Sequence, residues 1–257
     1  MDAVTLLHGF TLGGASWDDL TSRMPNEWRW IAPDLRGHGE APIDECTMDR
    51  CAADLVALWD HLGVERSHVV GYSMGGRLAL HVAVRLPERT RSLLTIGAHA
   101  GLEGSERDER RRTDEELAHR IETAGLDTFV HYWEELPMFA GVMHRERQFV
   151  ARLHEIRMRN TAAGLAASLR GMGAAAMEPL WDELPNIAVP CTFAAGERDH
   201  RFVDAALRMT GRVPDWRLRI VPDAGHAAHF EQPDTAAEIV ADHLRWAASV
   251  GSSSTTD

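Results

Sequence analysis

The segment 69–80, VVGYSMGGRLAL, restricts the possible folds more than any other part of the chain. A short β-branched run leads into a G-x-S-x-G pattern at 71–75, and helix-forming residues follow. This order predicts a strand, a sharp turn with Ser73 at its tip, and a helix that ends near Leu86, before Pro87. The backbone of a serine at such a turn is strained, and its neighbours must be small, which explains the glycines.

Strands and helices alternate on both sides of this segment. Thr47 is a suitable N-cap for a helix over 47–62, and a last helix is predicted over 234–248. The alternation predicts an α/β fold, with a mostly parallel central sheet flanked by helices. The predicted strands, some with the turn that follows, lie within residues 3–10, 29–39, 68–73, 91–98, 189–199 and 216–226.

Residues 101–179 interrupt this alternation, because they contain few β-branched runs and read as several helices without a strand. We therefore predict a first part of the core at 1–100, an inserted helical cap at 101–179 and a second part of the core at 180–249. The polar segment 250–257 is predicted to be a disordered tail.

The net charge of −12 is unfavourable for general binding to nucleic acid or to anionic membranes. All 27 basic residues are arginines, so arginine usage carries no signal and only the position of each arginine does. No apolar run is long enough to span a membrane, and no signal peptide is visible. Three scattered cysteines are typical of reduced thiols, so we expect a cytoplasmic protein.

The serine of the G-x-S-x-G turn needs a histidine to activate it and an acid to orient that histidine. Asp199 and His226 each follow a predicted strand, and the order Ser73, Asp199, His226 is that of a hydrolase triad. Asp34 and Asp223 are less suitable acids, because the first precedes the serine and the second is too close to His226 in sequence. We therefore predict a catalytic triad of Ser73, Asp199 and His226.

Two backbone amides are candidates for an oxyanion hole. The His-Gly turn after the first strand can direct the N–H of Phe10 towards the serine, and Met74 follows the serine directly. His229 lies three residues after His226, but no further ligand cluster accompanies this pair, so no metal site is predicted. Arg77 is one helical turn beyond Ser73 and can therefore lie on the same helix face as the serine.

In combination, six motifs resemble the 2-succinyl-6-hydroxy-2,4-cyclohexadiene-1-carboxylate (SHCHC) synthases of menaquinone biosynthesis, members of the α/β-hydrolase superfamily. The resemblance spans core and insertion, and it implies the α/β-hydrolase fold. We expect the usual N-terminal hairpin of that fold to be missing before the first strand. The motifs are GYSMGGR (71–77), RRTD (111–114), YWEELPMF (132–139), IRMRN (156–160), GERDHRF (196–202) and AGHAAHFEQP (224–233).

The resemblance also implies which residues bind the substrate, a small tricarboxylate. Arg77, Arg112 and Arg157 would bind carboxylates, Trp133 would form part of the pocket wall, and Arg201 corresponds to a basic residue after the triad acid. Two of these positions have competitors nearby. The alternatives to Arg112 are Arg110 and Arg111, and the alternative to Arg157 is Arg159.

The implied reaction eliminates pyruvate from 2-succinyl-5-enolpyruvyl-6-hydroxy-3-cyclohexene-1-carboxylate. Ser73 would then act as a base that removes a proton, and the oxyanion hole would stabilise the charge on the succinyl ketone. No metal or organic cofactor is expected, and the sequence leaves the oligomeric state open. The same triad also fits a serine hydrolase, either a carboxylesterase or a C–C bond hydrolase, of small carboxylated substrates. A non-catalytic receptor on this fold is a third alternative, which the complete triad disfavours.

Overall fold

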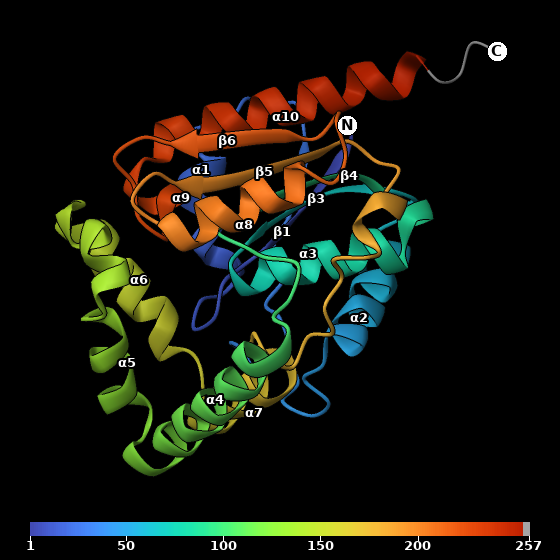
Figure 1. The fold of residues 1–257 in the computed structure, drawn as a ribbon. Helices are drawn as coiled ribbons and strands as arrows, with labels where there is room; N and C mark the ends of the chain where they lie inside the picture. Colours follow the sequence, from blue (N-terminus) through green and yellow to red (C-terminus); the bar gives the residue numbers. More distant parts are fainter. Residues whose placement is uncertain (254–257) are drawn as a thin grey trace.

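A computed structural model describes residues 1–253, and the side chains of residues 1–250 (Figure 1). Six strands form one sheet in the order β2-β1-β3-β4-β5-β6, and every neighbouring pair is parallel. The predicted parallel α/β fold is thereby confirmed. The strands are β1 (Ala3–Leu7), β2 (Arg29–Ile31), β3 (Ser67–Tyr72), β4 (Thr90–Ile96), β5 (Cys191–Gly196) and β6 (Arg217–Val221).

Helices of the sheet-forming part pack on both faces of the sheet. The predicted helix after Thr47 is present, and the Thr47 side chain accepts a hydrogen bond from the backbone N–H of Arg50 as an N-cap should. These helices are α1 (Asp18–Thr21), α2 (Met48–His61), α3 (Met74–Arg85), α8 (His200–Thr210), α9 (Ala228–Glu231) and α10 (Pro233–Ser253), with 3-10 turns η1 (Gly14–Trp17), η2 (Pro87–Arg89) and η4 (Leu184–Asn186).

Side chains of each strand alternate between two hydrophobic cores. In β1, Leu7 packs in the core that α2, α3 and α8 share, whereas Val4 and Leu6 pack in the core below α1 and α10. In β3, Val69 and Val70 divide in the same way. Because both faces are covered, the inner strands β1, β3 and β5 are buried along their whole length, whereas the edge strands β2 and β6 carry arginines and are only partly buried.

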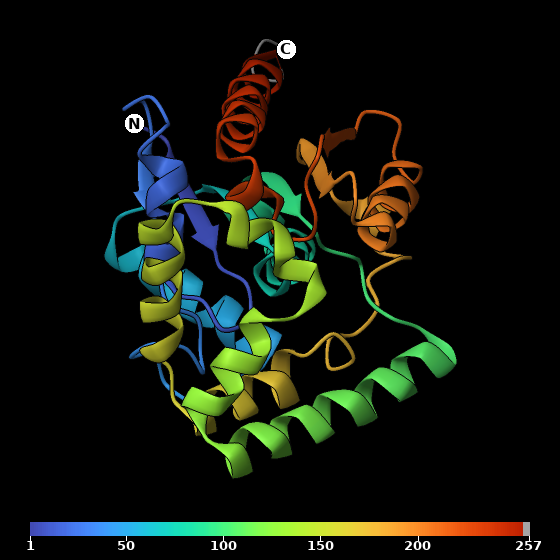
Figure 2. The same ribbon diagram turned by 90° about the vertical axis from the view of Figure 1, so that its left-hand side faces the viewer.

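Between β4 and β5 the chain forms helices only. Here α4 packs along α7 around a smaller apolar cluster that contains Leu165 and Phe129. In Figures 1 and 2, α4 lies at the opposite end of the molecule from α10. The elements are α4 (Gly104–Ala124), α5 (Leu126–Glu134), η3 (Pro137–His144), α6 (Arg147–Met158) and α7 (Ala162–Met172), which we call the inserted helices.

The first strand begins near the start of the described chain, and the last helix runs to its end. At the start, no hairpin precedes β1 within residues 1–253. At the other end, α10 continues to Ser253, so the predicted tail at 250–257 begins too early, and residues 254–257 lie outside the described part. None of the helices in residues 1–253 has the length and apolarity that a membrane span requires.

Candidate active site

Ser73 occupies a strained turn between β3 and α3. Its φ of 52° lies in the left-handed region, which residues with a Cβ rarely adopt. A Cβ on Gly71 would lie 2.2 Å from the carbonyl oxygen of Gly75, and one on Gly75 would lie 2.1 Å from that of Leu7. Both glycines of the motif are therefore required by close backbone contacts, as predicted.

The structure brings Ser73, His226 and Asp199 together. His226 Nε2 lies 3.0 Å from Ser73 Oγ, and His226 Nδ1 lies 2.7 Å from Asp199 Oδ2. The carboxylate accepts a hydrogen bond from Nδ1–H, which keeps the proton on Nδ1 and leaves Nε2 free to accept the hydroxyl proton of the serine.

The two rival acids have other partners. Asp34 Oδ1 accepts a hydrogen bond from the backbone N–H of Gly14 at 2.7 Å. Asp223 pairs with Arg198 at 2.7 Å on the surface. Neither contacts the imidazole of His226 in the part of the chain that the structure describes.

Backbone geometry also makes room for His226. A Cβ on Gly97 would lie 3.1 Å from His226 Cε1, and Gly97 has a φ of 61°. Gly97 directly follows β4, so the carboxyl ends of β3, β4, β5 and β6 all contribute to this site. Sites of open α/β sheets lie at this edge.

The predicted oxyanion amides lie beside the serine. Phe10 and Met74 line the same cavity as Ser73, and a Cβ on Gly9 would lie 3.6 Å from Ser73 Cβ. Within the described chain, neither the N–H of Phe10 nor that of Met74 has a hydrogen-bond acceptor. Two unpartnered donors next to a nucleophile can bind a developing oxyanion.

The loop that carries Phe10 is held from two sides. His38 Nε2 accepts a hydrogen bond from the N–H of Thr11 at 3.2 Å, and Asn160 Nδ2 donates to the carbonyl of Thr11 at 2.8 Å. Thr11 itself has a φ of 70°, a further strained residue at the site. Asn160 follows α6, so the inserted helices help to fix the oxyanion loop.

A cavity of about 230 Å³ opens above Ser73. The inserted helices supply one wall and the strand ends supply the other. Four arginines line it: Arg77, Arg110, Arg157 and Arg201.

Arg77 is buried and faces the cavity. Its Nη1 donates to the carbonyl of Met172 at 2.9 Å, and it forms no ion pair with any described residue. Burial, together with the charge of Arg110, lowers its pKa to about 10, so it stays protonated at neutral pH. A buried cation without a counter-ion is costly unless a ligand supplies the negative charge.

The other three cavity arginines are each paired with an acid. Arg110 Nε binds Asp114 at 2.6 Å, Arg157 Nη1 binds Glu134 at 3.0 Å, and Arg201 binds Glu106 at 2.8 Å. Burial lowers the pKa of Arg157, and its Nε has no partner. These arginines therefore keep free donors while their acids fix their positions.

These positions show which arginines of the two open alternatives line the cavity. The prediction for Arg112 needs correction, because this residue is exposed and does not line the cavity, whereas Arg110 does. Two residues turn an α-helix by about 200°, so Arg112 points away when Arg110 points inward. Arg157 lines the cavity as expected, and Arg159 is exposed elsewhere.

An aromatic wall completes the cavity. Trp133, predicted as a wall residue, lies 5.4 Å from the ring of Phe10 and 5.7 Å from that of Phe139. Its indole Nε1 is buried without a hydrogen-bond partner. The wall can thus bury an apolar ring and donate one hydrogen bond to a polar substituent of that ring.

The cavity residues that the sequence did not single out include Tyr72, His99 and Phe202. Tyr72 precedes the serine, and burial raises its pKa. His99 follows β4 in GAHAG, where a histidine between glycines after a strand was the available signal. His229, in contrast, packs between the rings of Trp17 and Tyr72 and is a core residue.

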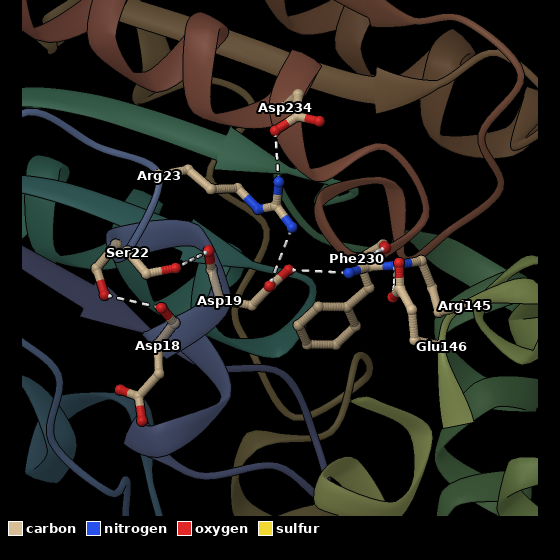
Figure 3. A network of polar contacts seen from close by, with 9 residues as sticks. Asp18, Asp19, Ser22, Arg23, Arg145, Glu146, Phe230 and Asp234 are labelled. Carbon is tan, nitrogen blue, oxygen red and sulfur yellow. Dashed lines mark hydrogen bonds and ion pairs between the residues drawn. The ribbon is translucent and has the colours of Figure 1, made fainter. Parts of the chain in front are cut away.

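A surface network ties the inserted helices to the segment after His226 (Figure 3). Arg145 donates to the carbonyl of Phe230 and, at 3.3 Å, to the carboxylate of Asp19. Asp19 also pairs with Arg23 at 3.2 Å, and Arg23 binds Asp234. Since Phe230 lines the cavity, Arg145 connects the cavity wall to α1 and α10.

Comparisons with known proteins agree with the fold described above and identify the family. The α/β hydrolase fold family matches residues 2–233. A Bacillus subtilis (strain 168) protein named as a candidate SHCHC synthase is 38% identical over 95% of this chain and 90% of its own. The SHCHC synthase of Serratia proteamaculans (strain 568) is 33% identical over 91% and 89%. The structure of MenH from S. aureus is 28% identical and superposes with a TM-score of 0.90, covering 96% of this chain and 94% of that one.

Proposed function

The chain belongs to the α/β hydrolase fold family and, within it, to the SHCHC synthases, and on that premise we propose that it is a carbon–oxygen lyase. It eliminates pyruvate from 2-succinyl-5-enolpyruvyl-6-hydroxy-3-cyclohexene-1-carboxylate and releases SHCHC. The observation that carries this proposal is the unpaired, buried charge of Arg77 inside the cavity above Ser73.

Charge supports a substrate with several carboxylates. The protein has a net negative charge, which repels anions. An anion therefore binds only where local cations outweigh this repulsion. Arg77, Arg110, Arg157 and Arg201 provide four guanidinium groups around one cavity, each able to bind a carboxylate with two donors. The aromatic wall of Trp133 matches a carbocyclic ring.

Ser73 acts as the base in this proposal. His226, oriented by Asp199, accepts the hydroxyl proton while Ser73 Oγ removes a proton from the carbon next to the succinyl ketone. The ketone oxygen becomes negative and is bound by the N–H groups of Phe10 and Met74. The C–O bond to the enolpyruvyl group then breaks, and the second double bond of the ring forms. His226 returns its proton to the leaving enolpyruvate, which is released as pyruvate.

This route requires no bond between Ser73 and a carbonyl carbon. The same triad and amides therefore serve an elimination as well as they would serve ester hydrolysis. We also propose that residues 101–179 act as a cap, because α4, α7 and the segment with Trp133 supply arginines and apolar wall to the cavity. We propose a cytoplasmic location, which the three unpaired cysteines support.

The decisive assay supplies the purified protein with the enolpyruvyl substrate. We expect release of pyruvate and, in step with it, the absorbance of the conjugated diene. Ser73→Ala is the matched control and should abolish both signals. p-Nitrophenyl acetate and butyrate are tested in parallel. Rapid ester hydrolysis without pyruvate release would replace the lyase by the alternative, a serine hydrolase of small carboxylated substrates.

A further inference from the structure

The imidazole of His99 faces the cavity with one nitrogen already engaged. Its Nδ1 accepts a hydrogen bond from the backbone N–H of Gly101 at 3.0 Å. A nitrogen that accepts carries no proton, so in the neutral ring the proton is on Nε2. Nε2 has no acceptor within residues 1–250, although His99 is only 6% exposed and lines the cavity.

The position of this ring is fixed by its neighbours. Gly97 and Gly101, with φ of 61° and 114°, bracket the segment. The carbonyl of Gly101 accepts from Trp181 Nε1 at 3.0 Å, and the N–H of Leu180 donates to the carbonyl of Ala100 at 2.7 Å. A donor on such a rigid segment is pre-organised for one ligand atom.

On one side His99 stacks on Phe202, at 5.9 Å between ring centroids and 27° between planes. Phe202 in turn lies 4.6 Å from the ring of His226. His99 is therefore separate from the proton-transferring histidine, although both line one cavity.

Three cations from three elements act on His99: Arg77 of α3, Arg110 of α4 and Arg201 of α8, of which the last two are each paired with an acid. Burial and these three charges lower the pKa of His99 to about 3, so the ring is neutral at physiological pH. A neutral donor among three guanidinium groups adds a hydrogen bond without adding repulsion between like charges. A carboxylate has about four lone-pair sites, more than one arginine fills.

We propose that His99 donates its Nε2–H to a substrate carboxylate that Arg77 and Arg110 also bind, and that it thereby helps to determine specificity for polycarboxylates. The inference rests on the proposed function for the identity of the substrate but not for the existence of the anion site. His99 acts in binding and takes no part in proton transfer.

Two substitutions separate the donor from the shape of the side chain. His99→Leu removes both the acceptor for Gly101 and the donor into the cavity, whereas the amide of His99→Gln keeps one acceptor and a donor. His243→Gln is the matched control, because His243 is also buried and neutral but both of its nitrogens have partners away from the cavity. Phthalate, a rigid dicarboxylate, serves as the probe in calorimetric titrations.

We expect His99→Leu to weaken phthalate binding and to raise the KM of the lyase reaction by about tenfold or more, since the lost hydrogen bond is to a charged group. The kcat should change much less. His99→Gln should stay within about threefold of the wild type, by the same reasoning. The control His243→Gln should lose stability and keep its affinity for phthalate.

Several results would overturn the inference. They are unchanged binding and KM in His99→Leu, equal losses in the leucine and glutamine variants, or a wild-type protein that does not bind phthalate. The ratio of the wild-type affinity to that of His99→Gln should also stay constant from pH 6 to 8.5, and a ratio that rises towards pH 6 would mean a titrating imidazole. Binding that depends on His99 without any pyruvate release would contradict the lyase function alone.

Discussion

Arg110 Nε donates to Asp114 Oδ1 at 2.6 Å, one helical turn further along α4. Asp114 is buried, and a Cβ on Gly173 would lie 2.6 Å from its other carboxylate oxygen. The acid therefore sits beneath α7 and turns the guanidinium of Arg110 towards the cavity. This pair explains why Arg110, and not its neighbours, is the arginine of α4 that reaches the site.

The first prediction compares two arginines of the same helix. Arg110→Ala should raise the KM for the enolpyruvyl substrate by about tenfold to a hundredfold, because a hydrogen bond to a charged group is lost. Arg112→Ala, the matched control, removes an exposed arginine and should leave the KM within about twofold, since such surface changes are small. Steady-state pyruvate release measures both. A greater effect of Arg112→Ala would mean that α4 is rotated when substrate binds.

The second prediction concerns the strain at Ser73. Ser73→Gly should abolish lyase activity but stabilise the fold relative to Ser73→Ala by about 1 kcal/mol, because glycine adopts a φ of 52° without strain. Part of the relief is offset by the greater entropy of glycine in the unfolded chain. Urea unfolding of the two variants measures the difference. Equal stabilities would show that the turn carries no net strain.

The third prediction tests the network in Figure 3. Arg145→Ala removes the donor to the carbonyl of Phe230 and to Asp19, and also the stacking on the ring of Phe149 at 4.2 Å. Phe230 should become more mobile, and kcat/KM should fall by about three- to tenfold, in line with one lost hydrogen bond. Arg23→Ala is the control, because it keeps the contact with Phe230. Limited proteolysis near 144–146 should accelerate only in Arg145→Ala.

Much of the fold could be predicted because local sequence signals agreed with one another. The G-x-S-x-G pattern, the N-cap at Thr47 and the apolar strands each indicated the element that is found. The end of α10 was misplaced because residues 251–253 are Gly-Ser-Ser, and helix ends depend on packing and fraying more than on composition.

The arginines show where sequence reasoning reaches its limit. Arg110, Arg111 and Arg112 follow one another in the sequence. Which of them faces the cavity depends on the rotation of α4 about its axis, and the buried Asp114 fixes that rotation. The helix has few apolar side chains, so its inward face could not be identified from hydrophobic periodicity. His99 was missed because one histidine after a strand carries no pattern until the arginines around it are placed.

The fourth prediction concerns stability in mild acid. Burial lowers the pKa of His8 and His68 to about 4, and that of His99, His229 and His243 to about 3. The pKa of His38 is lowered as well. In the unfolded chain all six titrate near 6.5, so below that pH the unfolded state binds more protons than the folded state. The stability that these neutral, buried imidazoles contribute to the folded state is fully present above pH 6.5 and is lost as the pH falls towards 4.

Each of these histidines should lower the free energy of unfolding by up to about 1.4 kcal/mol per pH unit between pH 6.5 and 4. Paired carboxylates such as Glu178 and Glu183, whose pKa values are lowered from 4.5, add to the loss only below that value. Urea unfolding at pH 8, 7, 6 and 5 should therefore show a plateau at the upper end and a steep decline from 6.5. His243→Gln should reduce the slope of the unfolding free energy against pH by the share of one titrating group, up to about 1.4 kcal/mol per pH unit, although it lowers stability at every pH. A free energy that stays constant down to pH 5 would mean that these imidazoles become protonated without unfolding.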